Sequence, residues 1–336
     1  MLSSLAVLGA GSWGTALAYL FSRRAEQVRL WARSSEAAAA MQGSRTNTRY
    51  LPGVILPNNV ECTDSLEEAL HDSDIVILAV PSFAVEQTSL QMASLLPQRA
   101  RLVSGSKGLE STTGKRLLEV VEGAVPGIRN RLSVLSGPNL AREAAAGMPT
   151  ATVVAAYDPA VATAVQAALS LPQFRIYTNP DVIGVELGGA LKNIIAIAAG
   201  ITDGLAYGEN TKAALVSRGL TEIRRLGRSL GAHDATFSGL SGIGDLYATC
   251  ASSQSRNHRV GFELGQGKSL NEILKGMDQI AEGVPTIQAA LLLASRTGVE
   301  MPITQCLHEV IFRGASPRRS VSALMARSHS SELDLV

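Results

Sequence analysis

A lysine inside an apolar stretch is the first candidate for chemistry. The sequence ELGGALKNIIAIAAG, residues 186–200, holds Lys192 among residues that are almost all apolar or glycine. An ammonium group moved out of water is costly unless it is paired or loses its proton. Lys192 therefore either extends its charged head to water along a buried stem or is buried because a reaction needs a proton there. The residues of this stretch leave both interpretations open.

A glycine-rich turn near the N-terminus is a candidate nucleotide site. Gly9, Gly11 and Gly14 have the spacing GxGxxG, with the apolar run LAVLG before them and the helical sequence TALAYLF after them. Glycines there allow a tight turn and a close approach of the backbone to a pyrophosphate, which the helix N-terminus then faces. Because both the strand and the helix are present, the motif predicts dinucleotide binding rather than a chance turn.

The end of the second predicted strand bears on the choice of cofactor. An acidic residue at that point would bind the ribose 2′-hydroxyl of NAD. The strand VRLWAR ends instead in Arg33, and an arginine suits the 2′-phosphate of NADP. The sequence therefore accepts NADP or NAD and favours NADP, unless Arg33 is only a solvated strand end.

Two later strands end in polar turns on what should be the same edge of a sheet. The turn SGSKGLE (104–110) contains Lys107, and the turn SGPNLARE (136–143) contains Asn139. Open α/β sheets bind their ligands along the edge where the carboxyl ends of the strands lie. Both side chains are therefore candidates for ligand contact, and Asn139 is also a candidate N-cap for the helix that follows it.

The second half of the chain offers a carboxylate and an anion site. In SGIGDLYATC, Asp245 opens a helix and Thr249 lies one turn later on the same face. In SSQSRNHRVGFELGQG, a helix begins at Ser255, Arg256 and Asn257. A hydroxyl, a guanidinium and an amide beside free N–H groups favour phosphate binding. The plainer alternative makes Ser255 only an N-cap and Arg256 only a surface charge.

Alternating strands and helices must position the first group of residues. Short apolar runs rich in β-branched residues predict strands, and amphipathic segments lie between them, which is typical of βαβ units. After Pro180 the strand signals stop and the pattern is helical. We therefore expect a chain of the α/β class, with a Rossmann-like, doubly wound, mostly parallel sheet over 1–180 and an all-α substrate domain over 181–330.

The expected strands are 5–9, 28–33, 74–80, 101–105, 132–137, 151–156 and 174–179. The expected helices of the second half are 182–201, 210–230, 245–250, 256–265, 269–275, 285–297 and 303–313. The last segment, SHSSELDLV, predicts a frayed tail.

Composition excludes several classes of function. Of the 336 residues 46% are hydrophobic and 18% charged, and the net charge is +1, so neither disorder nor a nucleic-acid-binding face is expected. Three distant cysteines and five scattered histidines predict neither a disulfide framework nor a metal site. No stretch reaches the roughly 18 apolar residues of a membrane span, and the N-terminus is not a signal peptide. We therefore expect a cytoplasmic protein that needs no metal.

Together the motifs resemble bacterial NAD(P)-dependent glycerol-3-phosphate dehydrogenases. The similarity is carried by the segments GAGSWGTALA, SGSKGLE, SGPNLARE, ELGGALKNIIAIAAG, GDLYATCASSQSRNHRVGFELGQG and AEGVPT, and it extends from about residue 4 to about residue 325. The resemblance implies reversible hydride transfer between NAD(P)H and dihydroxyacetone phosphate, which supplies glycerol 3-phosphate for phospholipid synthesis. A homodimer is the oligomer to consider.

The resemblance also implies roles for individual residues. Lys192 would be the general acid or base, Asn193 would help to shape the site, and Asp245 would orient the ammonium or hold a substrate hydroxyl. The positions that would surround the substrate are Lys107, Gly137, Asn139, Lys192, Asp245, Thr249, Ser255, Arg256 and Asn257. The positions that match cofactor contacts, besides the three glycines, are Ser12, Trp13, Arg33, Lys107, Ala141, Arg256, Ile280 and Glu282. Members of the family usually carry a serine or threonine where this chain has Asn139, which would replace a hydroxyl contact by an amide contact.

Two other functions compete with this one. A ketopantoate reductase or a 3-hydroxyacid dehydrogenase also places a lysine and an asparagine on a helix after a Rossmann domain, but Lys107 and the phosphate site at 255–257 argue against a carboxylate substrate. A non-catalytic dinucleotide sensor would need neither Lys192 nor Asp245.

Overall fold

The chain forms two compact units. The computed structural model describes residues 2–277 and 279–326. Within these residues, one unit comprises the chain up to Ser106 together with Leu117–Val182, and the other comprises Lys107–Arg116 and the residues from Ile183 onward. We call them the nucleotide unit, after the dinucleotide site that its glycine turn predicts, and the helical unit, and each is described by itself.

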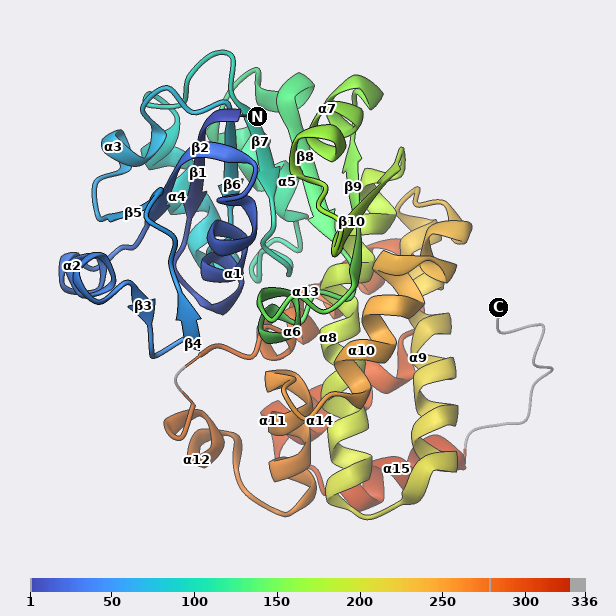
Figure 1. Ribbon diagram of the computed structural model, residues 1–336. Coiled ribbons are helices and arrows are strands. Elements are labelled where there is room, and N and C mark those ends of the chain that lie inside the picture. The colour runs from blue at the N-terminus through green and yellow to red at the C-terminus, as the bar shows by residue number, and fades with distance from the viewer. Residues whose placement is uncertain (1, 278, 327–336) are drawn as a thin grey trace. The chain divides into compact units, whose positions relative to one another are not determined.

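The nucleotide unit is built on an eight-stranded sheet with the order β10-β9-β8-β7-β6-β1-β2-β5 (Figure 1). All neighbouring strands are parallel except β8 and β9, which are antiparallel. This confirms the predicted fold class. The strands are β1 Leu2–Leu8, β2 Ala25–Trp31, β5 Val60–Thr63, β6 Ile75–Leu78, β7 Arg101–Ser104, β8 Leu132–Ser136, β9 Thr150–Ala156 and β10 Phe174–Asn179.

Helices cover both faces of this sheet, so its central strands are apolar on both sides. Leu5, Val7, Ile75 and Ile77 of β1 and β6 are almost completely buried, and Phe21 packs beside them. The helices are α1 Ser12–Phe21, α2 Ser35–Ser44, α3 Leu66–Leu70, α4 Val85–Met92, α5 Leu117–Ala124, α6 Ala141–Ala145 and α7 Pro159–Leu169, with short 3₁₀ turns at Ser82–Ala84 and Ile128–Arg131.

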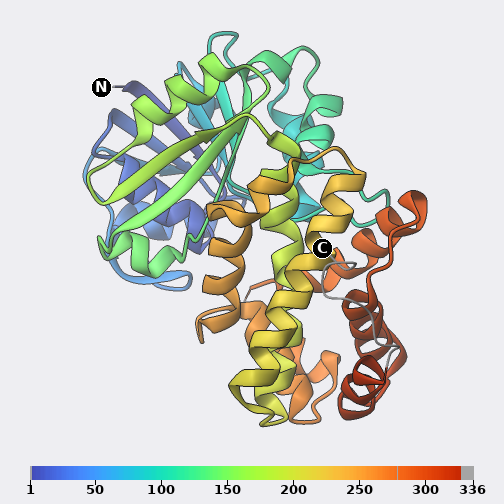
Figure 2. The same cartoon turned by 90° about the vertical axis from the view of Figure 1, so that its right-hand side faces the viewer.

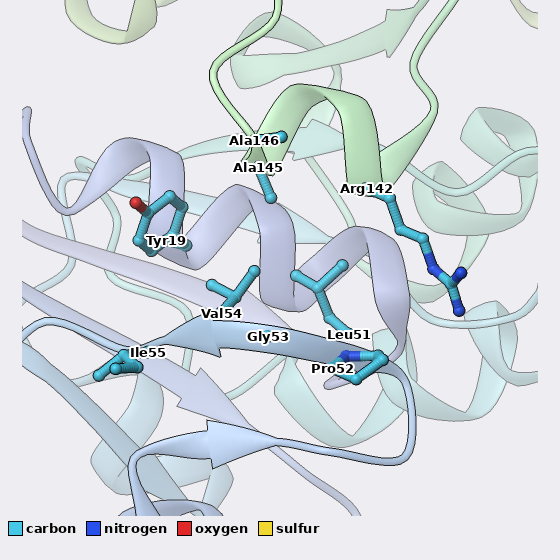
Figure 3. A pocket seen from close by; sticks show the side chains of 9 residues that line it. All are labelled: Tyr19, Leu51, Pro52, Gly53, Val54, Ile55, Arg142, Ala145 and Ala146. Carbon is cyan, nitrogen blue, oxygen red and sulfur yellow. The ribbon is translucent and has the colours of Figure 1, made fainter.

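Three strands of this unit were not predicted. Besides β5, the strands β3 Thr46–Asn47 and β4 Leu51–Ile55 form a separate antiparallel pair. With two and four residues, β3 and β5 are too short to show an alternation of apolar and polar residues. In β4, Pro52 and Gly53 predict a turn rather than a strand. Figure 3 shows β4 facing α1 and α6 across a pocket of about 480 Å³, with Tyr19 and Arg142 at its rim. None of the predicted site residues lines this pocket.

The helical unit surrounds one long apolar helix, α8 Val182–Gly204 (Figures 1 and 2). The other elements are α9 Gly208–Ser229, a 3₁₀ turn Asp234–Ser238, a π turn Leu240–Gly244, α10 Asp245–Ala251, α11 Arg256–Gly265, α12 Leu270–Lys275, α13 Gly283–Thr297, α14 Pro302–Arg313 and α15 Pro317–Met325. Two predictions were wrong in detail, because α13 begins two residues before Pro285 and α15 was not predicted. The predicted tail, 328–336, lies outside the described residues.

Helix α8 is long and, by mean hydropathy, apolar enough to cross a membrane, although Glu186, Lys192 and Asn193 interrupt its apolar run. However, 94% of its most apolar 18-residue window is buried inside the structure. Ile194, Ile195 and Ile197 lie in the largest apolar cluster of the helical unit. Its apolar composition is therefore accounted for by its position in the core.

The segment Lys107–Arg116 leaves the nucleotide unit between β7 and α5 and packs with the helices instead. Arg116 forms a 2.5 Å ion pair with Glu186 on α8, and Arg296 of α13 donates to the carbonyl of Thr113 at 2.7 Å. Leu109 joins the core of the helical unit. Lys107 is thereby supplied to the helical unit by a segment that lies in the chain between strand β7 and helix α5.

Candidate active site

The ammonium of Lys192 is buried and paired. Its Nζ donates to Oδ1 of Asp245 and to Oγ1 of Thr249, the latter at 2.8 Å. Lys192 is only 7% exposed, so the interpretation that its head extends to water is wrong. The Thr249 hydroxyl donates to the backbone carbonyl of Asp245 at 2.7 Å, which leaves its oxygen as the acceptor for Lys192. Two of the three N–H groups of the ammonium are taken by these contacts.

The carboxylate of Asp245 is shared by two lysines. Lys107 Nζ donates to Oδ2 at 2.7 Å while Lys192 binds Oδ1, and Asp245 is 1% exposed. The π turn before α10 lies against α8 so closely that a Cβ on Gly188 would be 2.3 Å from the carbonyl oxygen of Ser241. Glycine at that position allows the turn, and so the carboxylate after it, to approach the lysine helix.

Burial changes the acidity of this lysine. Burial, helped by the neighbouring charge of Lys107, lowers the pKa of Lys192 to about 8, against the opposing effect of the Asp245 carboxylate. An amine with a pKa in this range exchanges a proton near neutral pH, which an ordinary lysine does not. The cluster is chemically suited to give a proton to an oxygen and to take it back.

The first turn of α11 is joined to α8 by a hydrogen bond between two asparagine side chains. Ser255 is the N-cap and accepts from the backbone N–H of His258. Asn257 donates to Oδ1 of Asn193 at 2.9 Å and accepts from the backbone N–H of Gly283 at the same distance. Lys192 and Asn193 are adjacent on α8, so this relay connects the lysine helix to the first turns of α11 and α13.

Arg256 and the segment before α13 are also connected. The Arg256 guanidinium donates to the backbone carbonyl of Ile280 at 2.7 Å. Glu282 is the N-cap residue of α13, and Ile280 is 39% exposed. A Cβ on Gly283 would lie 2.6 Å from the Asn193 carbonyl oxygen, which explains why glycine occupies that position.

In the nucleotide unit, the glycine turn has the geometry that a pyrophosphate requires. Gly9 has φ +115° and lies so close to β6 that a Cβ would be 2.7 Å from the Ala79 carbonyl oxygen, and a Cβ on Gly14 would be 1.8 Å from that of Gly9. Gly11, the N-cap of α1, makes no side-chain cap bond, and a Cβ there would meet nothing within 4 Å. The space beside Gly11 at the start of α1 is therefore open, as the approach of a dinucleotide phosphate requires.

Buried polar atoms at the carboxyl edge of the sheet also fit a ligand. Among the described residues, Trp13 Nε1 and Asn139 Oδ1 are buried without a hydrogen-bond partner, which is costly in the absence of a ligand. Asn139 donates through Nδ2 to Thr152 Oγ1 at 3.0 Å, and α6 has Leu140 as its N-cap without a side-chain bond. The predicted capping role of Asn139 is therefore wrong, because the hydroxyl of the neighbouring strand binds its amide.

Two family models match this chain. The N-terminal domain of NAD-dependent glycerol-3-phosphate dehydrogenase matches residues 4–162, and its C-terminal domain matches residues 181–322. The chain belongs to that family.

Individual relatives agree with the assignment. The chain is 48% identical to glycerol-3-phosphate dehydrogenase [NAD(P)+] of Pelotomaculum thermopropionicum, over 100% of this chain and 97% of that one. It is 49% identical to the protein of the same name in Corynebacterium glutamicum strain R, over 98% and 99% of the two chains. A crystal structure of glycerol-3-phosphate dehydrogenase from Coxiella burnetii superposes with a TM-score of 0.93 at 39% identity, over 97% and 99% of the chains.

Ketopantoate reductases share the fold alone. The structure from Ralstonia eutropha superposes with a TM-score of 0.61 at 14% identity, over 95% of this chain and 99% of that one. The shared fold explains why the sequence is compatible with a ketopantoate reductase as well as with a glycerol-3-phosphate dehydrogenase.

The predicted residues of the family site divide between the two units. Hydrogen bonds in the helical unit bring together Lys107, Lys192, Asn193, Asp245, Thr249 and Asn257. The glycine turn, Ser12, Trp13, Arg33, Gly137, Asn139 and Ala141 belong to the nucleotide unit. Arg33 is exposed and lies two residues beyond β2, which ends at Trp31, earlier than predicted. Ala141 is the first residue of α6, and Gly137 has φ +156° with a Cβ position 2.9 Å from Thr152 Cα.

Other residues that support the glycine turn were not predicted. Asn47 of the β3–β4 pair donates to the Ala10 carbonyl at 2.9 Å and to Thr15 Oγ1 at 2.8 Å, and Ser12 Oγ donates to the Tyr50 carbonyl at 2.6 Å. The polar run RTNTRY at 45–50 was the only signal for them. Across the described residues, no group of three or more His, Cys, Asp or Glu side chains is placed to bind a metal ion.

Proposed function

We propose that this chain catalyses the reversible reduction of dihydroxyacetone phosphate to sn-glycerol 3-phosphate with NADPH or NADH. Membership of the family supports the reaction. The observation that carries the mechanism is the buried ammonium of Lys192, held between Asp245 and Thr249 with a lowered pKa. The reduced nicotinamide, when bound, supplies the hydride that reaches C2 of the ketone.

In this mechanism Lys192 supplies the proton. Its remaining N–H group donates to the C2 carbonyl oxygen, polarises the carbonyl and passes its proton to the developing alkoxide. In the reverse direction the neutral amine accepts the proton of the C2 hydroxyl. Asp245 and Thr249 are positioned to direct the amine, and Lys107 holds the opposite oxygen of the carboxylate. Asn193 keeps the first turn of α11 beside the lysine helix through Asn257.

The substrate phosphate is assigned to the N-terminus of α11. Free N–H groups, the Ser255 hydroxyl, the Arg256 guanidinium and the Asn257 amide supply its contacts. Lys107, Gly137, Asn139 and Thr249 complete the proposed substrate contacts.

The cofactor is assigned to the glycine turn, where Gly9, Gly11 and Gly14 admit the pyrophosphate and Ser12 and Trp13 begin the helix. Trp13 Nε1 offers a donor to the bound nucleotide, whereas Asn139 Oδ1 offers an acceptor to the substrate. Arg33 favours the 2′-phosphate of NADP. The remaining proposed contacts are Lys107, Ala141, Arg256, Ile280 and Glu282. Synthesis of a phospholipid precursor, a cytoplasmic location and a homodimer are further parts of the proposal.

A spectrophotometric assay tests this function. Purified protein should oxidise NADPH with dihydroxyacetone phosphate, and far more slowly with dihydroxyacetone, ketopantoate or a 3-oxo acid. Preference for ketopantoate or an oxo acid would favour the related reductases. Binding of NADPH without turnover of any of these ketones would favour a dinucleotide sensor.

A further inference from the structure

Helices α8 and α11 are packed backbone against backbone. Glycines spaced four residues apart face each other on the two helices. A Cβ on Gly200 would lie 2.0 Å from the His258 carbonyl oxygen, and a Cβ on Gly261 would lie 1.9 Å from that of Ile197. Gly204 and Gly265 extend the same contact. A Cβ on Gly204 would lie 3.0 Å from Gly265 Cα, and a Cβ on Gly265 would lie 2.9 Å from Gly204 Cα. The anion-binding helix α11 therefore rests directly on the helix that carries Lys192.

A polar contact lies along the seam between α8 and α11, by which we mean the glycine contact of Gly200 and Gly204 with α11 and of Gly261 and Gly265 with α8. His258 Nε2 is 2.7 Å from Oδ2 of Asp203, in the last turn of α8. Lys212 of α9 donates to the same carboxylate, with an N–O distance of 3.0 Å, and is 3.2 Å from Glu209. Desolvation raises the pKa of Asp203, but the hydrogen bonds from His258 and Lys212 outweigh it and leave the pKa below its ordinary value. The carboxylate is therefore held charged and ties together three helices.

This cluster is electrostatically close to the proposed catalytic one. Burial raises the pKa of the Cys250 thiol to about 12, and the charges of Lys192, Asp245, Lys212 and Asp203 all act on that thiol. Cys250 lies on α10, one residue after Thr249. The lysine site and the Asp203 cluster thus both lie within electrostatic range of one buried side chain.

His258 connects the seam to the first turn of α11. It follows Asn257 directly, its backbone N–H donates to the Ser255 N-cap at 3.2 Å, and its carbonyl is the group that Gly200 admits. Its side chain extends the contact of this turn to Asp203, in the last turn of α8. The glycines place no side chains between the two helices at these positions, so the orientation of α11 about its own axis depends on side-chain contacts such as that of His258 with Asp203.

We infer that His258 is a positioning residue for phosphate recognition, acting through Asp203 to fix the orientation of the α11 N-terminus relative to Lys192. The inference rests on the proposed function in taking the bound group to be the phosphate of the substrate. Helix N–H groups bind an anion only when they point at it, so a small rotation of α11 weakens phosphate binding without removing any group that touches the phosphate.

Enzyme variants test the inference. His258→Ala should raise the KM for dihydroxyacetone phosphate and the inhibition constant of inorganic phosphate by about tenfold, the effect of losing one hydrogen bond to a charged group. The kcat, the KM for NADPH and the KM for unphosphorylated dihydroxyacetone should change by less than about twofold. His258→Gln, whose amide can still donate to Asp203, should recover part of the loss. Arg259→Ala is the matched control, because it removes the exposed Arg259–Glu263 ion pair from the same helix and should behave as the wild type.

The outcomes separate the inference from the proposed function. Unchanged phosphate inhibition in a folded His258→Ala variant would overturn the inference, as would an equal loss with dihydroxyacetone. If that variant fails to melt cooperatively, His258→Gln and Asp203→Asn decide by the same constants, with weakened phosphate inhibition expected for Asp203→Asn. If the wild type does not reduce dihydroxyacetone phosphate, the proposed function fails, and calorimetric binding of inorganic phosphate to wild type and His258→Ala still decides the role of the histidine.

Discussion

At the scale of single residues, Lys192 combines a positive charge with a transferable proton, and two substitutions separate them. Lys192→Ala removes both, and we expect kcat to fall by about 10²- to 10⁴-fold, the usual contribution of a general acid or base. Lys192→Arg retains the charge but cannot release a proton near neutral pH, so it should restore little activity. Both variants need a melting temperature and a measured substrate affinity. An Arg variant that is folded and retains near-normal kcat would mean that another group supplies the proton.

The pH dependence of the reaction follows from the same lysine. Reduction needs the protonated amine, so kcat/KM for reduction should fall as pH rises through about 8, the pKa of buried Lys192. Oxidation of glycerol 3-phosphate needs the neutral amine, so its kcat/KM should rise through the same range. Loss of both limbs in Lys192→Ala, measured at saturating cofactor, would assign them to this residue, whereas unchanged limbs would assign them elsewhere.

Arg33 decides the choice of cofactor if it meets a 2′-phosphate. We expect Arg33→Asp to raise the KM for NADPH strongly and the KM for NADH little. Loss of a charge-assisted contact is worth about 1.5–3 kcal/mol, so the preference should shift by about ten- to hundredfold. Arg175→Asp makes the same charge change at an exposed position of the edge strand β10 and should leave the ratio unchanged. An equal loss with both cofactors in Arg33→Asp would show that Arg33 does not read the phosphate.

At the scale of elements, the seam between α8 and α11 depends on glycine. Gly261→Ala would place a methyl group 1.9 Å from the Ile197 carbonyl oxygen, so the helices must separate. We expect a loss of about 1–3 kcal/mol or more in the free energy of unfolding, measured by urea denaturation. In Gly123→Ala the methyl group would meet nothing within 4 Å on the exposed face of α5, and a gain of about 0.5–1 kcal/mol is expected. Similar effects of the two substitutions would mean that the seam relaxes easily.

Sequence patterns predicted most elements because buried strands and helices carry the signal along their own length. The strands of the main sheet other than β5 were found this way. The strands β3, β4 and β5 were missed because strands of two to five residues are too short to show the alternation of apolar and polar residues. In β4, Pro52 and Gly53 also favour a turn. Membership of Lys107–Arg116 in the helical unit depends on Arg116–Glu186 and Arg296–Thr113, contacts between residues 70 and 183 positions apart. No local pattern contains that information.

The candidate site shows the same limit. GxGxxG is a local motif, and its strand, turn and helix were predicted from adjacent residues. Lys192 and Asp245 are 53 positions apart, and only the resemblance to a family paired them. Asn139 was expected to cap α6, but Thr152 on the adjacent strand binds its amide instead, a competition that the residues around Asn139 do not show.

At the scale of the whole molecule, buried charge makes stability depend on pH. Glu222 of α9 is 2% exposed and accepts from the backbone N–H groups of Ile303 and Thr304, at 2.5 and 3.3 Å, and from the Thr304 hydroxyl at 3.0 Å. It therefore caps α14, whose own N-cap residue, Met301, makes no side-chain bond. Burial raises the pKa of Glu222 to about 7, although these three hydrogen bonds and the charge of Arg225 oppose that rise.

The sign of the effect follows from proton binding. The unfolded carboxyl loses its proton near pH 4.5 and the folded one near pH 7, so between these values the folded state binds more protons. The free energy of unfolding should then fall as pH rises through this window, by at most about 1.4 kcal/mol per pH unit from this group. Glu222→Gln cannot titrate, so the wild-type value minus the variant value should decline from pH 4.5 to 7 and be level above that. Glu26→Gln, at an exposed position, should give a level difference throughout. A level difference for Glu222→Gln as well would mean that the carboxylate is charged across the whole range, with the first turn of α14 compensating fully for its burial.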